Sequence, residues 1–127
     1  MADRAARAMI LAGLFCGAVQ AQPSPGFDGK WLAKFTSPRG DPREAVLIIN
    51  GSAGTWEHQI QARNNPCGGR EVPIAVAAAS DTDLEVKIFN SKALVGCSDG
   101  TISAKRIDDR KLEGTFEDGR KVTLVRP

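Results

Sequence analysis

The segment Gly96-Cys97-Ser98-Asp99-Gly100 matches G-x-S-x-G, the pattern that exposes a nucleophilic serine on a sharp turn in α/β-hydrolases. That chemistry needs a strand before the serine, a helix after it and a histidine downstream. The only histidine, His58, lies upstream, and the residues after Gly100 alternate like a strand. We therefore interpret the pattern as a turn beside a cysteine. We expect no catalytic residues, and we expect that the protein is not an enzyme.

His58 lies in the most regular alternation of the chain, Thr55 to Ala62, where every second residue from Trp56 onward is on one face. A period of two is typical of a strand. A histidine on that apolar face is either a core residue with one ring nitrogen satisfied by a neighbour or a polar group that orients a ligand in a cavity. We expect any pocket to be lined by four residues: Trp31, Phe35, Trp56 and His58.

The acidic pairs of the sequence do not have the spacing of a metal site. A calcium loop reads D-x-[DN]-x-[DN]-G, and none of the pairs continues in this way. A zinc site lacks ligands, since the chain has one histidine and no C-x-x-C. The pairs fall between predicted strands, so we expect solvated turns, no metal and no cofactor; they are Asp81 and Asp83, Asp108 and Asp109, and Glu117 and Asp118.

Residues 1–21 have the three parts of a secretory signal peptide. Arg4 and Arg7 supply the positive charge, an apolar run follows from Ala8 to Val19, and Val19-Gln20-Ala21 resembles a cleavage site. The apolar run is too short for a membrane-spanning helix, which needs about 20 residues. The sequence thus predicts export, cleavage after Ala21, a periplasmic or secreted protein and no stable membrane anchor.

Export determines how the three cysteines are interpreted. Cys16 leaves with the signal peptide, so that Cys67 and Cys97 remain. An even number of cysteines in an exported chain predicts a disulfide. Such a bond would stabilise the fold by roughly 3–4 kcal/mol in the chain-entropy model. The net charge of +2, without any run of like charges, gives no basis for nucleic-acid binding.

Gln22–Gly26 is a proline-rich leader that we expect to be extended and mobile. We expect residues 27–127 to form a single domain. Short apolar runs separated by Gly, Asn, Asp and Pro predict an all-β fold. We expect this fold to be a small antiparallel meander barrel of about eight strands, or a sandwich, with one disulfide. The predicted strands are Lys30–Thr36, Ala45–Asn50, Thr55–Ala62, Val72–Ala79, Leu84–Asn90, Thr101–Ile107, Lys111–Glu117 and Arg120–Arg126.

Three of these segments carry further expectations. Ala45–Asn50 is apolar on both faces, which favours a strand covered on both sides or one that crosses the centre of the sheet. Val72–Ala79 mixes helix-favouring alanines with Pro73 and two valines, and we interpret it as a strand. Residues 91–100 allow a helical turn before Cys97.

Gly29-Lys30-Trp31, at the start of the first predicted strand, resembles the G-x-W motif of lipocalins and avidin-like calycins. In those folds the tryptophan closes one end of the barrel, and an arginine of the last strand packs over it. The resemblance implies these roles for Trp31 and for Arg126, which is in phase with Val122 and Leu124. A cation–π contact of this kind contributes about 1–2 kcal/mol.

The stretch FDGKW, from Phe27 to Trp31, also resembles small exported bacterial proteins that begin with F-D-G-x-W after a signal peptide and carry one disulfide on a β-sheet domain. This resemblance implies fold class and location rather than an activity.

Together these patterns favour an exported, non-catalytic binding protein whose partner is a small apolar molecule or a protein surface. If the barrel is packed solid, binding moves to the loops Ser37–Glu44 and Arg63–Arg70. The alternative is a periplasmic inhibitor of a cell-wall hydrolase such as lysozyme, since small disulfide-tied barrels inhibit such enzymes by inserting a loop. This alternative is an analogy of size and location.

Overall fold

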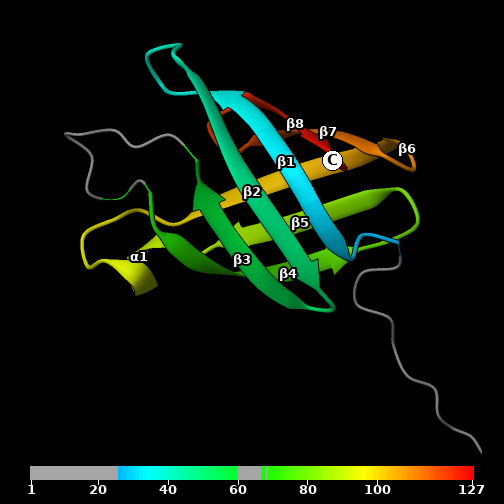
Figure 1. Ribbon diagram of the computed structural model, residues 1–127, viewed down its shortest axis with the longest axis horizontal. Coiled ribbons are helices and arrows are strands. Elements are labelled where there is room, and N and C mark those ends of the chain that lie inside the picture. Colours follow the sequence, from blue (N-terminus) through cyan, green and yellow to red (C-terminus); the bar gives the residue numbers. More distant parts are fainter. Residues whose placement is uncertain (1–25, 60–66, 68) are drawn as a thin grey trace, which may run out of the picture.

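The computed structural model describes residues 26–59, 67 and 69–127 (Figure 1). The predicted signal peptide, residues 1–21, and residues 22–25 of the leader lie outside them. Eight strands and one short helix are present in the described part: β1 (Gly29–Thr36), β2 (Pro42–Asn50), β3 (Ala53–His58), β4 (Glu71–Ala79), β5 (Asp83–Ile88), α1 (Asn90–Ala93), β6 (Gly100–Asp108), β7 (Lys111–Phe116) and β8 (Lys121–Val125).

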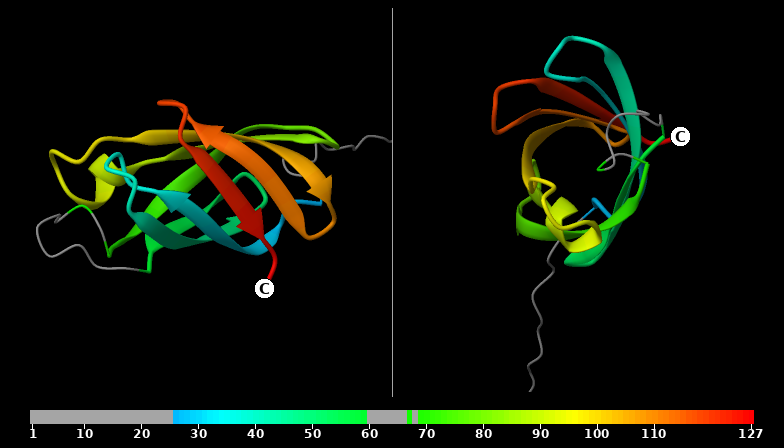
Figure 2. Two further views of the ribbon diagram at one scale, coloured as in Figure 1. Left: turned by 90° about the horizontal axis from the view of Figure 1, so that it is seen from above. Right: turned by 90° about the vertical axis from the view of Figure 1, so that its left-hand side faces the viewer.

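The strands form a closed barrel in chain order, so the fold is a barrel and not a sandwich. Each strand pairs antiparallel with the next, and β8 pairs back with β1 through Leu32↔Val125 and Phe35↔Val122. The right-hand view of Figure 2 shows the strands surrounding the barrel axis. The all-β antiparallel meander and the helical turn before Cys97 are confirmed, and the ambiguous alanine-rich segment is strand β4.

Most of the predicted strands differ from the observed ones by one or two residues at an end, and two differences are larger. The first predicted loop, Ser37–Glu44, ends at Asp41 because β2 begins at Pro42 and pairs with Thr36. The strand predicted for Thr55–Ala62 begins earlier, at Ala53, and ends at His58, because Gln59 already lies beyond β3; residues 60–62 lie outside the described part.

The expectation that Ala45–Asn50 is covered on both sides is wrong. In the barrel only one face of each strand points inward, so Ala45, Leu47 and Ile49 are buried while Ile48 is 41% exposed. The core is one cluster of inward side chains to which all eight described strands contribute. Within the described residues, no helix has the length and apolar character needed to cross a membrane.

Two inward positions are occupied by glycine because the neighbouring backbone leaves no room for a side chain. A Cβ on Gly54 of β3 would overlap the carbonyl oxygen of Ile48 and lie 2.9 Å from its carbonyl carbon. A Cβ on Gly114 of β7 would overlap the carbonyl oxygen of Ser103 and lie 2.7 Å from Cα of Ala104. Such glycines allow the sharp bends by which a small sheet closes into a barrel.

Candidate binding cavity at the open end of the barrel

Trp31 closes one end of the barrel. Its side chain is fully buried, and its Nε1 donates a hydrogen bond to the carbonyl oxygen of Phe27 at 2.9 Å. The guanidinium carbon of Arg126 lies 4.0 Å from the centre of the Trp31 ring. The prediction that Trp31 lines the pocket is therefore wrong, because the residue is sealed at the opposite end of the barrel from the cavity described below.

Arg126 also binds the chain that enters the barrel. Its Nη1 donates to the carbonyl oxygen of Asp28 at 2.9 Å, and its Nη2 donates to that of Gly26 at 2.7 Å. The last residue of the predicted leader is thus held by the end of the chain. Gly29 has a φ of +116°, and a Cβ there would lie 2.9 Å from Arg126 Nη1. This is a physical reason for glycine in the G-x-W motif.

A second arginine covers the neighbouring aromatic residue at the closed end. The guanidinium carbon of Arg106 lies 4.3 Å from the centre of the Phe27 ring, and its Nε donates to the carbonyl oxygen of Asp81. Both contacts are within the distance at which a cation attracts an aromatic ring. This end is therefore shut by two buried aromatic rings and two cations.

In the described part of the chain, the opposite end of the barrel is open and contains a cavity of about 370 Å³. Three of the four predicted pocket residues, Phe35, Trp56 and His58, line it. The other lining residues are Ser37, Pro38, Arg43, Ile88, Asn90, Ser98, Asp99, Gly100, Phe116, Glu117, Asp118 and Arg120. The volume is within the usual range for a small-molecule site, and the walls combine apolar rings with a few polar groups, as such sites do.

Three aromatic rings and the imidazole form a cluster at the base of this cavity. The Phe35 ring lies 5.2 Å from that of Phe116 and 5.7 Å from that of Trp56, and the Trp56 and Phe116 rings are 6.3 Å apart and nearly perpendicular. His58 makes edge contacts with Phe35 and Trp56. Edge-to-face contacts at these distances are favourable and hold the rings in fixed orientations.

Sequence reasoning did not select Phe116, Arg43 or Arg120 as pocket residues, although the alternation contains the signal. In an up-and-down barrel, odd-numbered strands end where even-numbered strands begin. Phe35, His58 and Phe116 are at the ends of β1, β3 and β7. The same rule puts Trp31, at the beginning of β1, at the other end. The open end also contains Arg43, near the start of β2, and Arg120, just before β8, because even-numbered strands begin there.

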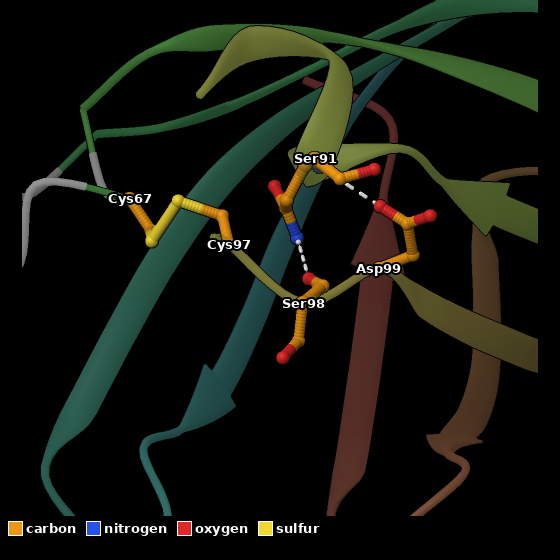
Figure 3. The surroundings of a disulfide bond; sticks show 6 residues. Cys67, Ser91, Cys97, Ser98 and Asp99 are labelled. Atoms are coloured by element: carbon orange, nitrogen blue, oxygen red, sulfur yellow. Dashed lines mark hydrogen bonds between the residues drawn. A yellow bond between two sulfur atoms is a disulfide. The ribbon is translucent and has the colours of Figure 1, made fainter. Parts of the chain in front are cut away.

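The rim of the cavity is held together by the disulfide, which confirms the predicted Cys67–Cys97 bond. Figure 3 shows it beside α1, where an Asp99 Oδ1 accepts a hydrogen bond from the Ser91 backbone N–H at 2.9 Å. Nearby, the Asn90 side chain donates to the carbonyl oxygen of Ser98. The cross-link thus joins the segment between β3 and β4 to the segment between α1 and β6.

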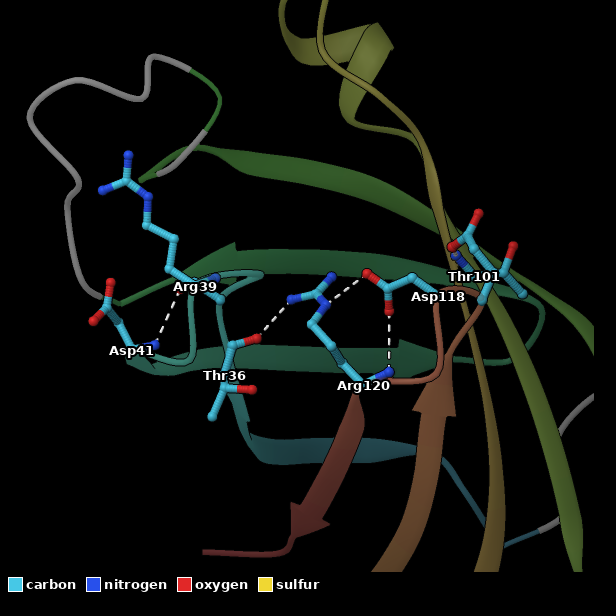
Figure 4. Close-up of polar contacts among 8 residues, drawn as sticks. Thr36, Arg39, Asp41, Thr101, Asp118 and Arg120 are labelled. Atoms are coloured by element: carbon cyan, nitrogen blue, oxygen red, sulfur yellow. Dashed lines mark hydrogen bonds and ion pairs between the residues drawn. The ribbon is translucent and has the colours of Figure 1, made fainter.

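Arg120 is fixed on the other side of the rim (Figure 4). Its Nε donates to Asp118 Oδ2 at 2.7 Å, and its Nη1 donates to the carbonyl oxygen of Thr36 at 2.6 Å. Its guanidinium carbon lies 4.6 Å from the centre of the Phe116 ring. Arg120 therefore links the β7–β8 turn to the end of β1 and covers part of the aromatic cluster.

Ser98 and His58 line the same cavity. Within the described part of the chain, no hydrogen bond joins a ring nitrogen of His58 to Ser98. The same residues contain no group of three or more His, Cys, Asp or Glu side chains arranged to hold a metal ion.

His58 has a lowered affinity for protons. Burial lowers its pKa below the ordinary value of 6.5, and the positive charges of Arg43 and then Arg120 lower it further. The imidazole is therefore mainly neutral at pH 7, with one ring nitrogen as a hydrogen-bond donor and the other as an acceptor.

The free energy of unfolding should therefore fall as the pH is lowered below 6.5. In this range the unfolded chain binds a proton at His58 that the folded chain excludes, so the unfolded state is favoured. The slope cannot exceed about 1.4 kcal/mol per pH unit for one proton. Urea unfolding of the tag-free protein at pH 7.5, 6.5 and 5.5 measures this pH dependence. These pH values lie roughly above the range in which carboxylates titrate.

His58→Gln is the matched control for this prediction, because His58 is the chain's single histidine. The variant should have a nearly constant free energy of unfolding over the same pH range. A wild-type protein without this pH dependence, or a variant that keeps it, would contradict the placement of His58 in an apolar, cationic environment.

A second hollow of about 550 Å³ lies over strands β4 to β7. Most of its lining side chains point outward, and of the described residues that line it none is aromatic; they include Ala78, Glu85, Ser103, Lys105 and Thr115. We therefore place the candidate site in the smaller cavity at the open end, where aromatic and hydrogen-bonding groups converge.

No protein-family model matches the chain, and no curated protein sequence matches it. Among solved structures, a redesigned β-barrel is similar, with a TM-score of 0.52 and 14% identity over 87% of this chain and 99% of that one. A second redesigned β-barrel, mFAP1 bound to DFHBI, has a TM-score of 0.49 and 15% identity over 84% and 100% of the two chains. At identities this low the first likeness shows the fold alone, which is an eight-stranded β-barrel.

Proposed function

We propose that this chain is an exported, non-catalytic binding protein that holds one small apolar molecule in the cavity at the open end of its barrel. The observation that carries the proposal is the cavity of about 370 Å³ above the Phe35, Trp56 and Phe116 rings. The closed end supports it, since Trp31 and Arg126 seal that end of the barrel and a ligand would enter at the other.

Burial of a ligand against aromatic rings favours binding through the hydrophobic effect. The rings are oriented by contacts with each other and with Arg120, so little conformational entropy is lost when a ligand enters. The cavity has no paired nucleophile and base among its described residues, and binding without turnover is the function that this arrangement supports best.

The test follows the indole N–H signals of the chain's two tryptophans by NMR while uncharged naphthalenemethanol is added. The Trp56 signal should shift and saturate with a Kd below about 1 mM, because a ligand of this size buries enough apolar surface for such an affinity. The Trp31 signal, at the sealed end, should not move. A Trp31→Phe variant assigns the two signals.

No saturable shift of the Trp56 signal, or equal shifts of both signals, would contradict the proposal. Absence of binding together with inhibition of lysozyme in a cell-wall turbidity assay would instead favour a protein partner at the rim. Export is tested separately by fractionating cells that express the full chain, with a mature protein beginning at Gln22 as the expected result.

A further inference from the structure

Among the described residues, the polar groups on the inward face of the strands at the open end are cationic or neutral. Arg43 is in phase with the buried Ala45 and Leu47 of β2, and Arg120 is in phase with Val122 of β8. Both strands flank β1, where Phe35 pairs with Arg43 on one side and with Val122 on the other. Arg43 of β2 and Arg120, next to the start of β8, therefore flank the end of β1 that carries Phe35.

The carboxylates that line the cavity are more numerous than the cations, but they come from turns and outward positions and are engaged by the main chain. Glu117 Oε1 accepts a hydrogen bond from the backbone N–H of Thr101 at 2.7 Å, and Asp99 Oδ1 accepts one from the backbone N–H of Ser91. Asp118 accepts from the backbone N–H and from Nε of Arg120. These hydrogen bonds lower the pKa of Asp99 and of Asp118.

The cations retain hydrogen-bond donors. The Nη2 of Arg43 is 3.8 Å from the Asp41 carboxylate, beyond hydrogen-bonding distance, and its Nη1 bonds the carbonyl oxygen of the adjacent Pro42. Among the described residues, Nη2 of Arg120 has no hydrogen-bond acceptor. Each arginine side chain is about a quarter exposed, at 26%. Donors of this kind form strong charge-assisted bonds with a carboxylate.

We infer that the ligand is a small aromatic carboxylate, whose ring packs on the Phe35–Trp56–Phe116 cluster and whose carboxylate accepts hydrogen bonds from Arg43 and Arg120. The inference rests on the proposed function and adds one acidic group to the apolar ligand proposed there. An aromatic ring of the ligand can make the same edge and face contacts that the rings of the cluster make with each other. A carboxylate on the ligand matches the two guanidinium groups that line the same cavity.

The test compares naphthoate with naphthamide, two ligands of nearly equal shape that differ in charge, by calorimetry at low salt. Naphthoate should bind about tenfold more tightly to the wild-type protein, because hydrogen bonds to a charged acceptor are stronger than those to a neutral one. In Arg43→Met the preference should fall below about threefold, and raising the salt concentration should reduce it in the wild type.

Arg39→Met is the matched control, because the Arg39 side chain carries the same charge on the adjoining loop and, among the described residues, makes no hydrogen bond or ion pair. It points away from Arg120 in Figure 4. This variant should keep the tenfold preference. Circular dichroism and urea unfolding of Arg43→Met should match those of Arg39→Met, which shows that the barrel remains folded.

The outcomes separate this inference from the proposed function. If both ligands bind with equal affinity, or naphthamide binds better, the carboxylate assignment is overturned while the apolar binding site stands. If neither ligand binds, both proposals fail. A preference for naphthoate that Arg43→Met leaves unchanged would likewise overturn the role of the arginine pair.

Discussion

Replacing Gly54 by alanine should lower the free energy of unfolding by at least about 3 kcal/mol, or prevent folding altogether. The new Cβ would overlap the carbonyl oxygen of Ile48 and approach Cα of Ile49 to 3.2 Å. Both are backbone atoms of the paired strand β2, so a change of side-chain rotamer cannot relieve the overlap. Strand β3 would have to move away from β2 at the point where the barrel bends.

Gly100→Ala is the control for this substitution. A Cβ on Gly100 would contact only the Glu117 Oε1, at 3.6 Å, and the change should alter the free energy of unfolding by less than about 0.5 kcal/mol. Circular dichroism shows whether each variant folds, and urea unfolding measures its free energy of unfolding. A Gly54→Ala protein as stable as Gly100→Ala would contradict the close approach of β3 to β2. Gly114→Ala, at the second bend, should behave like Gly54→Ala.

The strand order and most strand boundaries follow from local sequence. Alternation from Leu84 to Ile88 is visible in the residues themselves, and Asp118-Gly119 specifies the turn between β7 and β8, with Gly119 at a φ of +91°. Closure of the barrel does not follow from local sequence. It depends on pairing of Leu32 with Val125, across almost the whole domain, and alternation is the same in a barrel and in a sandwich.

The site shows the same division between local and long-range information. Trp31 and Trp56 are both large, inward and on regular strands, so composition and phase treat them alike. They differ in depth along the barrel axis, because one is near the start of β1 and the other near the end of β3. The contribution of Arg43 and Arg120 also depends on strand direction, and so it could be predicted only after the barrel had been assumed.

Removing the disulfide by the double substitution Cys67→Ser and Cys97→Ser should lower the free energy of unfolding by about 3–4 kcal/mol. The bond closes a loop of 30 residues, and without it the unfolded chain gains the conformational entropy of that loop. Urea unfolding with and without reductant measures the effect. The wild-type protein under reducing conditions should resemble the double variant, and the variant should not respond to reductant.

The same substitution should affect the two ends of the barrel differently. The bond joins the β3–β4 segment to the segment that carries Ser98 and Asp99, both of which line the cavity. Trp31 and Arg126 at the closed end make no contact with it in the described structure and are held by their own hydrogen bonds. In the folded double variant, the indole N–H signal of Trp56 should therefore move while that of Trp31 stays in place. An unchanged stability, or a larger movement at Trp31, would show that the cross-link does not organise the open end.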